Sequence, residues 1–94
     1  MCDMGACIDA IVLDETDNVA TALRSLRSGE LIRLRGDKRS KSMVLTEHIP
    51  RGHKLALVDI KRDDYVIKYG EIIGKASVFI HKGSYVHIHN LRGR

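Results

Sequence analysis

The sequence predicts a mainly β domain with one helix, and three observations support that fold class. Short apolar segments rich in β-branched residues follow one another from residue 30 onward, and turn-forming or charged residues separate them. Helical spacing of apolar residues is found in one segment, near residues 17–28. The length of 94 residues suits one domain with one modest core. We therefore predict a single domain over residues 1–94, with residues 1–5 flexible.

The N-terminal part predicts a strand and then the helix. Residues 6–13 alternate their side chains with the period of an extended chain. Asp17 and Asn18 follow with short polar side chains that can cap a helix, and Gly29 supplies a stop signal. The apolar residues at helical spacing between them are Val19, Ala22, Leu23 and Leu26. This segment predicts an amphipathic helix of about three turns that packs on a sheet.

The rest of the chain predicts strands. Turn-forming residues separate the apolar segments, as at Gly36, Gly70 and Gly83, and Gly52 follows the only proline, Pro50. The predicted strands cover residues 31–35, 42–46, 54–58, 65–68, 71–79 and 84–89. No linker, repeat or low-complexity stretch interrupts them, which again favours one continuous domain.

Composition limits the classes of partner. The chain has 16 Lys and Arg residues against 12 Asp and Glu residues, a net charge of +4 with neutral histidines, and this balance suits an anionic partner. Its three tyrosines and one phenylalanine have no stacking motif or zinc-finger spacing around them, so we do not expect a nucleic-acid partner. A small polyanion or carboxylate fits better.

The sequence also bears on location and on the cysteines. No apolar run approaches the ~18 residues that cross a bilayer, and Asp3 and Asp9 stand where a signal peptide would carry basic and then apolar residues. We therefore expect a cytoplasmic protein without membrane contact. Cys2 and Cys7 are the only cysteines, and we expect both to be reduced thiols, with neither a disulfide framework nor a four-ligand zinc site.

Five segments together carry a family resemblance. They are Asp17-Asn18-Val19-Ala20 with Ala22-Leu23, Ile49-Pro50-Arg51-Gly52-His53-Lys54 with Ala56-Leu57, Val66-Ile67-Lys68-Tyr69-Gly70, Ile73-Gly74-Lys75-Ala76, and Ile80 through Lys82-Gly83 to Val86-His87-Ile88-His89-Asn90. In this order they resemble the small SAF-type domain of the altronate/galactarate dehydratase family, which also includes the small subunit of sulfolactate sulfo-lyase. The resemblance covers most of the chain and implies a β-clip fold.

The resemblance implies a role in a lyase. The family reaction is β-elimination from a 2-hydroxy acid, in which water leaves a sugar acid such as altronate or sulfite leaves sulfolactate. The large catalytic region that usually follows is absent after Arg94, so we expect the small subunit of a two-chain dehydratase, with a large catalytic subunit as partner. A divalent metal, iron or manganese, would be held mainly by that partner.

Two alternatives to this function stay open at this point. The chain is either the small subunit of a sulfolactate sulfo-lyase, which acts on a sulfonate, or a non-catalytic β-clip binding module. Whether the chain also forms a homo-oligomer is left open as well.

Three histidines predict part of a substrate site. His87 and His89 are two residues apart on the predicted strand 84–89, so their side chains should share one face. His53 converges on them from the turn at Gly52. Neutral imidazoles bind substrate oxygens or divalent metals, so these three residues are also the metal candidates.

Lys68 and Asn90 complete the candidate set. Lys68 lies in an otherwise apolar segment, where it either clamps a carboxylate or extends its charged end to solvent. Asn90 either donates its amide to the substrate or caps the last strand. Lys54 is interpreted as a solvated strand lysine. The candidate substrate-binding residues are therefore His53, Lys68, His87, His89 and Asn90, and no residue is assigned a catalytic role.

Overall fold

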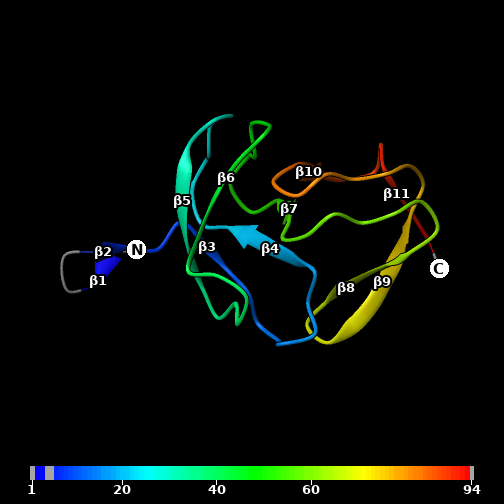
Figure 1. Cartoon of the computed structure of the whole chain (residues 1–94), viewed down its shortest axis with the longest axis horizontal. Helices are drawn as coiled ribbons and strands as arrows, with labels where there is room; N and C mark the ends of the chain where they lie inside the picture. The colour runs from blue at the N-terminus through cyan, green and yellow to red at the C-terminus, as the bar shows by residue number, and fades with distance from the viewer. Residues whose placement is uncertain (1, 4–5, 94) are drawn as a thin grey trace.

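Three antiparallel or mixed sheets make up the computed structural model, which describes residues 2–3 and 6–93 (Figure 1). The strands are β1 (Cys2–Asp3), β2 (Ala6–Cys7), β3 (Ala10–Ile11), β4 (Val19–Ala22), β5 (Leu31–Arg35), β6 (Ser42–Val44), β7 (Lys54–Ala56), β8 (Tyr65–Lys68), β9 (Glu71–Ala76), β10 (Tyr85–Val86) and β11 (Leu91–Arg92). No helix occurs among the described residues. The mainly β fold class is confirmed, and the single helix is wrong.

The largest sheet has six strands in the order β10-β7-β4-β3-β5-β6. Its pairs are antiparallel except β3 with β5, which run parallel. A second sheet has the order β11-β9-β8, and β1 with β2 forms a separate hairpin. Figure 1 shows that hairpin projecting at one end of the molecule and the β8, β9 and β11 sheet at the other. Most strands are short, as the frequent turn residues predict.

Residues 19–22 of the segment predicted as a helix, residues 17–28, form β4 instead. Val19, Ala20 and Ala22 are each 1% exposed. β4 pairs with β3 along one edge and with β7 along the other, which uses its backbone groups in the sheet. A short apolar run buried on both faces has no clear period, so it can be mistaken for a helix. Tertiary burial on two sides therefore decides this element against its helical spacing.

The two faces of β4 contribute to two different cores. Ala20 and Ala22 pack in a cluster with Leu26, Ile32 and Leu55 among others. Val19 packs in a second cluster, which joins β7, β8, β9 and β10. Its other buried members are Ala56, Ile60, Val66, Ala76, Ile80 and Val86. β4 thus links the six-stranded sheet to the β8, β9 and β11 sheet.

Asp17 and Asn18, predicted as helix caps, hold the β8–β9 hairpin. The Asp17 side chain is 1% exposed, and its carboxylate accepts hydrogen bonds from the backbone amides of Asp14 (3.2 Å), Tyr69 (3.0 Å) and Gly70 (2.8 Å). Tyr69 and Gly70 both have positive φ, 58° and 73°, as the tight turn between two antiparallel strands requires. The predicted helix cap is therefore wrong, because the Asp17 carboxylate accepts from the β8–β9 turn and from Asp14 and not from the N-terminus of a helix.

Asn18 adds a second connection to the same hairpin. Its Oδ1 accepts a hydrogen bond from the Ile67 amide (2.8 Å), and its Nδ2 donates to the Tyr65 carbonyl (2.9 Å). The backbone amide of Asn18 also donates a hydrogen bond to the Ile67 carbonyl (3.2 Å). These contacts fix β8, and with it Lys68, against the six-stranded sheet.

Several predicted strand bounds change in the structure. Residues 31–35 and 65–68 are confirmed as strands, whereas the predicted strand 6–13 is divided into β2 and β3. The predicted strand 84–89 is wrong beyond Val86, because residues 88–90 form a turn. Residues 1, 4 and 5 of the segment predicted to be flexible lie outside the described part of the chain.

The N-terminal hairpin corrects the prediction for the cysteines. Cys7 is disulfide-bonded, so the expectation of two reduced thiols is wrong. The antiparallel register of β1 and β2 sets the backbone of Cys2 opposite that of Cys7, a proximity that sequence spacing alone did not suggest.

No helix with the length and apolarity to cross a bilayer is found in the described ranges.

Candidate functional site

Four rings meet where β7 begins and β10 ends, and we call them the imidazole cluster: His53, Tyr85, His87 and His89. The Tyr85 hydroxyl lies 2.7 Å from Nδ1 of His53. The rings of Tyr85 and His87 are nearly parallel, with an interplanar angle of 8° and centroids 5.4 Å apart. His53 contacts His87 at 4.9 Å, and His89 contacts Tyr85 at 5.5 Å. The three histidine candidates are therefore brought together by the fold.

Strand pairing explains this convergence. β7 and β10 are antiparallel, with Tyr85 opposite Leu55 and Val86 opposite Lys54. One step further along the same register, His53 precedes β7 and His87 follows β10, so the two imidazoles lie side by side. Directly opposite residues of an antiparallel pair share a face. A separation of more than thirty residues in the sequence is thus closed by two short strands.

His89 reaches the cluster in a different way from the one predicted. His87 and His89 were expected to share a face of one strand, but β10 ends at Val86. The chain then turns, and the Asn90 amide donates to the His87 carbonyl at 3.1 Å. This turn returns His89 toward Tyr85. The two residues are close because of a turn, not because of strand alternation.

Asn90 organises that turn. Its side chain is buried, its Oδ1 accepts a hydrogen bond from the His87 amide (2.9 Å), and its Nδ2 donates to the Tyr85 carbonyl (2.7 Å). Both ends of the amide are therefore engaged by backbone groups of the cluster residues. Of the two interpretations open from sequence, this geometry favours the capping interpretation for Asn90.

Lys54 lies near His87 of the imidazole cluster, and Lys68 lies near Lys54. Lys54 and Lys68 are both half-buried, although Lys54 was interpreted as fully solvated. Burial and then the positive charge of Lys68 lower the pKa of Lys54 below its ordinary value. The Lys68 ammonium lies 4.7 Å from the centroid of the Tyr69 ring, a cation–π contact. Neither lysine forms an ion pair with any residue that the structure describes.

The electrostatics of this region favour a neutral His87. Partial burial, followed by the nearby His53, Lys54 and His89, lowers the pKa of His87 below its ordinary value. A lowered pKa means that the imidazole stays unprotonated to lower pH than a free histidine. No described residue forms a side-chain hydrogen bond with the His87 ring. His87 therefore presents a neutral imidazole that can accept a proton.

Metal binding by these residues alone is not supported by their arrangement. Within residues 2–3 and 6–93, no group of three or more His, Cys, Asp or Glu side chains has the geometry to hold a metal ion. Nδ1 of His53 already faces the Tyr85 hydroxyl. His53, His87 and His89 thus do not form a complete site for a divalent metal. The arrangement is better suited to hydrogen bonding and to contact with an anion.

Comparison with known proteins identifies the family of the chain and agrees with its all-β fold. Residues 8–94 match the family model described as the altronate/galactarate dehydratase SAF domain. The chain belongs to this SAF domain family. The all-β structure of the SAF domain also agrees with the β-clip fold that its motifs imply.

The relatives of this SAF domain differ in length. The altronate dehydratase of Bacillus subtilis is 40% identical over 82 residues, which cover 87% of the SAF domain chain but 16% of the relative. The galactarate dehydratase (L-threo-forming) of Escherichia coli is 38% identical over 78 residues, or 14% of its length. The chain thus spans about one sixth of the dehydratases it matches. The (2R)-sulfolactate sulfo-lyase subunit alpha of Chromohalobacter salexigens is 33% identical over 88 residues and is covered over 94% of its length.

Sequence reasoning missed two residues of the candidate site in the SAF domain. Tyr85 received no role, although it stands two and four residues before His87 and His89 and its phenol can pair with an imidazole. Lys54 was set aside because a lysine after a turn is usually solvated. Its proximity to Lys68 depends on the pairing of β4 with β7 and the docking of β8, which local sequence does not report.

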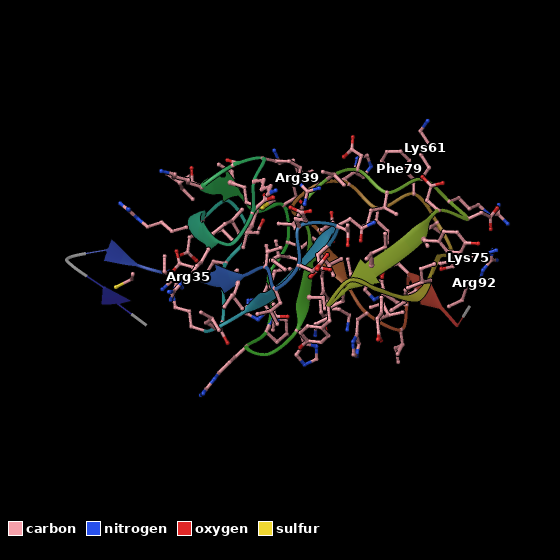
Figure 2. The ribbon with its side chains drawn as sticks, turned by 90° about the horizontal axis from the view of Figure 1, so that it is seen from below. Arg35, Arg39, Lys61, Lys75, Phe79 and Arg92 are labelled. Atoms are coloured by element: carbon pink, nitrogen blue, oxygen red, sulfur yellow. The ribbon has the colours of Figure 1, made fainter. Side chains whose placement is uncertain are left out.

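Basic residues elsewhere in the SAF domain do not converge in this way. Figure 2 shows Arg35 near one end of the molecule and Lys75 and Arg92 at the other, with Arg39 and Lys61 in between. The net charge is therefore spread over the surface. The imidazole cluster is distinguished by its ring contacts and by the lowered pKa values of His87 and Lys54 rather than by the number of its charges.

Proposed function

We propose that this chain contributes part of the substrate site of a lyase that removes water from a sugar acid such as altronate by β-elimination. A large catalytic partner supplies the rest of the site. The observation that carries the proposal is the imidazole cluster with Lys54 near His87 and Lys68 near Lys54. Neither lysine has an ion-pair partner among the described residues. Membership of the SAF domain family and the dehydratase relatives support it.

The chemistry of the cluster suits a 2-hydroxy acid. Elimination requires a base for the proton beside the carboxylate and positive charge for the enolate that develops. Neutral His87 is the candidate base, because its lowered pKa keeps the imidazole unprotonated. Lys54 and Lys68 are the candidate cations for the substrate carboxylate. Of the two roles left open for Lys68 by the sequence, the proposal takes the carboxylate clamp and adds Lys54 to it.

A catalytic partner follows from what this face lacks. The described residues hold no cluster of carboxylates and no three-ligand metal group. A divalent metal such as iron or manganese, if the reaction uses one, is therefore proposed to bind to groups of the partner. The dehydratase relatives are six or more times longer than the matched segment, which is consistent with a site completed outside it.

A second candidate substrate is sulfolactate. The observation that favours it is the similarity to the (2R)-sulfolactate sulfo-lyase subunit alpha of Chromohalobacter salexigens, which extends over 94% of that subunit at 33% identity. Both candidates are 2-hydroxy acids whose carboxylate suits Lys54 and Lys68. They differ in the leaving group, which is water in one case and sulfite in the other.

The test is reconstitution. The chain is purified alone and together with a large dehydratase-like chain from the same genome, and each preparation is offered altronate, galactarate and sulfolactate. We expect no turnover by the chain alone and turnover of one substrate by the pair. Product is measured as the 2-keto acid, and sulfite is measured separately. Turnover by the isolated chain, free of any partner, would contradict the subunit proposal, and a stable but inactive complex would favour a non-catalytic binding module.

A further inference from the structure

Tyr85 contacts every other ring of the imidazole cluster. Its ring centroid lies 5.6 Å from that of His53, 5.4 Å from His87 and 5.5 Å from His89. Its hydroxyl also hydrogen-bonds to Nδ1 of His53 at 2.7 Å. No other described aromatic residue makes contacts with all three histidines. Tyr85 is therefore placed to control how these imidazoles present their nitrogen atoms.

The direction of the hydrogen bond follows from the chemistry of the two groups. A phenol O–H is a stronger acid than the N–H of a neutral imidazole, and an unprotonated imidazole nitrogen is a good acceptor. The Tyr85 hydroxyl has no other hydrogen-bond partner among the described residues. A phenol that donates to Nδ1 pairs the more acidic proton with the better acceptor, so we take the phenol as the donor and Nδ1 as the acceptor.

This direction determines the tautomer of His53. A neutral imidazole carries one proton, and an Nδ1 that accepts a hydrogen bond leaves that proton on Nε2. No described residue forms a hydrogen bond with Nε2 of His53, and the side chain is half-buried at the edge of the cluster. Nε2–H is thus available to donate to a substrate oxygen.

We propose that Tyr85 is a positioning residue, which holds His53 as the Nε2–H tautomer and so makes His53 a hydrogen-bond donor to substrate rather than a base. The inference rests on the proposed function for the identity of the substrate, a 2-hydroxy acid. It assigns different tasks to neighbouring imidazoles: His53 holds a substrate oxygen, and His87 is left to accept the proton. The parallel stacking of Tyr85 on His87 fixes the second ring beside the first.

The first test concerns the tautomer and needs no enzyme activity. The full chain is labelled with ¹⁵N-histidine, and ring nitrogen shifts are recorded at about pH 9, where ordinary imidazoles are neutral. His53 is assigned by its loss in His53→Gln. We expect His53 to be the Nε2–H tautomer in the native chain, and Tyr85→Phe to shift its Nδ1 resonance and admit the second tautomer.

A matched control separates the hydroxyl from any tyrosine change. Tyr69 is exposed, and its hydroxyl has no hydrogen bond to a described residue, so Tyr69→Phe should leave the His53 resonances in place. An Nδ1–H tautomer in the native chain overturns the proposal. An Nδ1 resonance that Tyr85→Phe leaves as unchanged as Tyr69→Phe does also overturns it.

The second test uses the reconstituted two-chain enzyme. Loss of one ordinary hydrogen bond costs about 0.5–1.5 kcal/mol, so Tyr85→Phe should lower kcat about two- to twelvefold while KM changes little. In a His53→Gln background the same change should have no further effect, because Tyr85 acts through His53. Fully additive effects of the two substitutions, or a change confined to KM, contradict the positioning role.

The two tests can refute the proposed function and the role of Tyr85 separately. If the reconstituted pair turns over none of the candidate acids, the proposed function is wrong, but the tautomer measurement still decides whether Tyr85 positions His53. If the pair is active and the native tautomer is Nδ1–H, the proposed function stands and the role of Tyr85 is wrong.

Discussion

The cations of the exposed ion pairs each have a carboxylate partner, whereas the two lysines near the imidazole cluster do not have one among the described residues. Arg24 pairs with Glu30, Lys38 with Glu15, and Arg92 with Asp63, and each of these cationic side chains is about half exposed or more. Lys54 and Lys68, by contrast, are half-buried and have no ion pair with a described residue. Exposed pairs contribute little energy, whereas an unpaired, partly buried cation attracts an anion. The difference teaches that local pairing, not net charge, separates Lys54 and Lys68 of the proposed site from these cations.

The largest expected effect concerns stability and tests the anchoring of the β8–β9 hairpin, which carries Lys68, by Asp17. Replacing Asp17 with Ala removes a buried carboxylate and leaves the Tyr69 and Gly70 amides without their acceptor. We expect the free energy of unfolding to fall by about 3 kcal/mol, measured by urea denaturation.

A carboxylate of the exposed ion pairs provides the control for that experiment. Asp63 pairs with Arg92 at the surface, with a side chain 59% exposed. Asp63→Ala should change stability by less than about 0.5 kcal/mol. Equal losses from Asp17→Ala and Asp63→Ala would show that the anchoring of the β8–β9 hairpin by Asp17 is unimportant.

The next effect concerns activity. His87→Ala and His89→Ala should each leave the chain folded, since both side chains lie at the edge of the cluster, and should lower kcat/KM of the two-chain enzyme about tenfold or more. His48→Ala is the matched control, because His48 is exposed and lies outside the ring contacts of the cluster. Activity is measured together with a thermal melt of each variant. Native turnover by both cluster variants would make these histidines ordinary surface residues.

The smallest effect sharpens the electrostatic side of the comparison. Lys54 is one of the charges that lower the pKa of His87, after burial and His53. Lys54→Met keeps much of the side-chain bulk and removes the charge, so the His87 pKa should rise, as followed by NMR titration. Lys41→Met, at the β5–β6 hairpin, should leave it unchanged. A His87 pKa that does not respond to Lys54→Met would mean that the two groups are screened from each other by solvent.

The same lowered pKa predicts a small dependence of stability on pH. In the unfolded chain His87 has its ordinary pKa of 6.5, whereas in the folded chain the pKa of His87 is lower, so protonation requires a lower pH. The contribution of His87 to stability is therefore complete above this value and is lost as the pH falls below it. His87→Ala should reduce this slope, measured by urea denaturation between about pH 7 and pH 5.

The outcome for the candidate site differs from residue to residue. His53, His87 and His89 were selected from turns and spacing, and the fold brings them together. The argument for two of them was nevertheless wrong, because it relied on a strand that ends at Val86. Tyr85 was missed, since a tyrosine in a strand usually signals packing, and its hydrogen bond depends on a partner 32 residues away.

The sequence by itself determined the β character, most turn positions and the family of this protein. Those features depend on local propensity and on ordered short motifs, such as the positive-φ glycines at Gly36, Gly52 and Gly83, which act over a few residues.

Only the tertiary structure decided the conformation of residues 19–22 and the composition of the site. Burial of β4 against two cores and pairing on both edges overrode its helical spacing, because these energies come from segments distant in the chain. In the same way, the half-buried state of Lys54 and the hydrogen bond from Tyr85 to His53 arise from strand pairing and hairpin docking. Local sequence carries no record of such contacts.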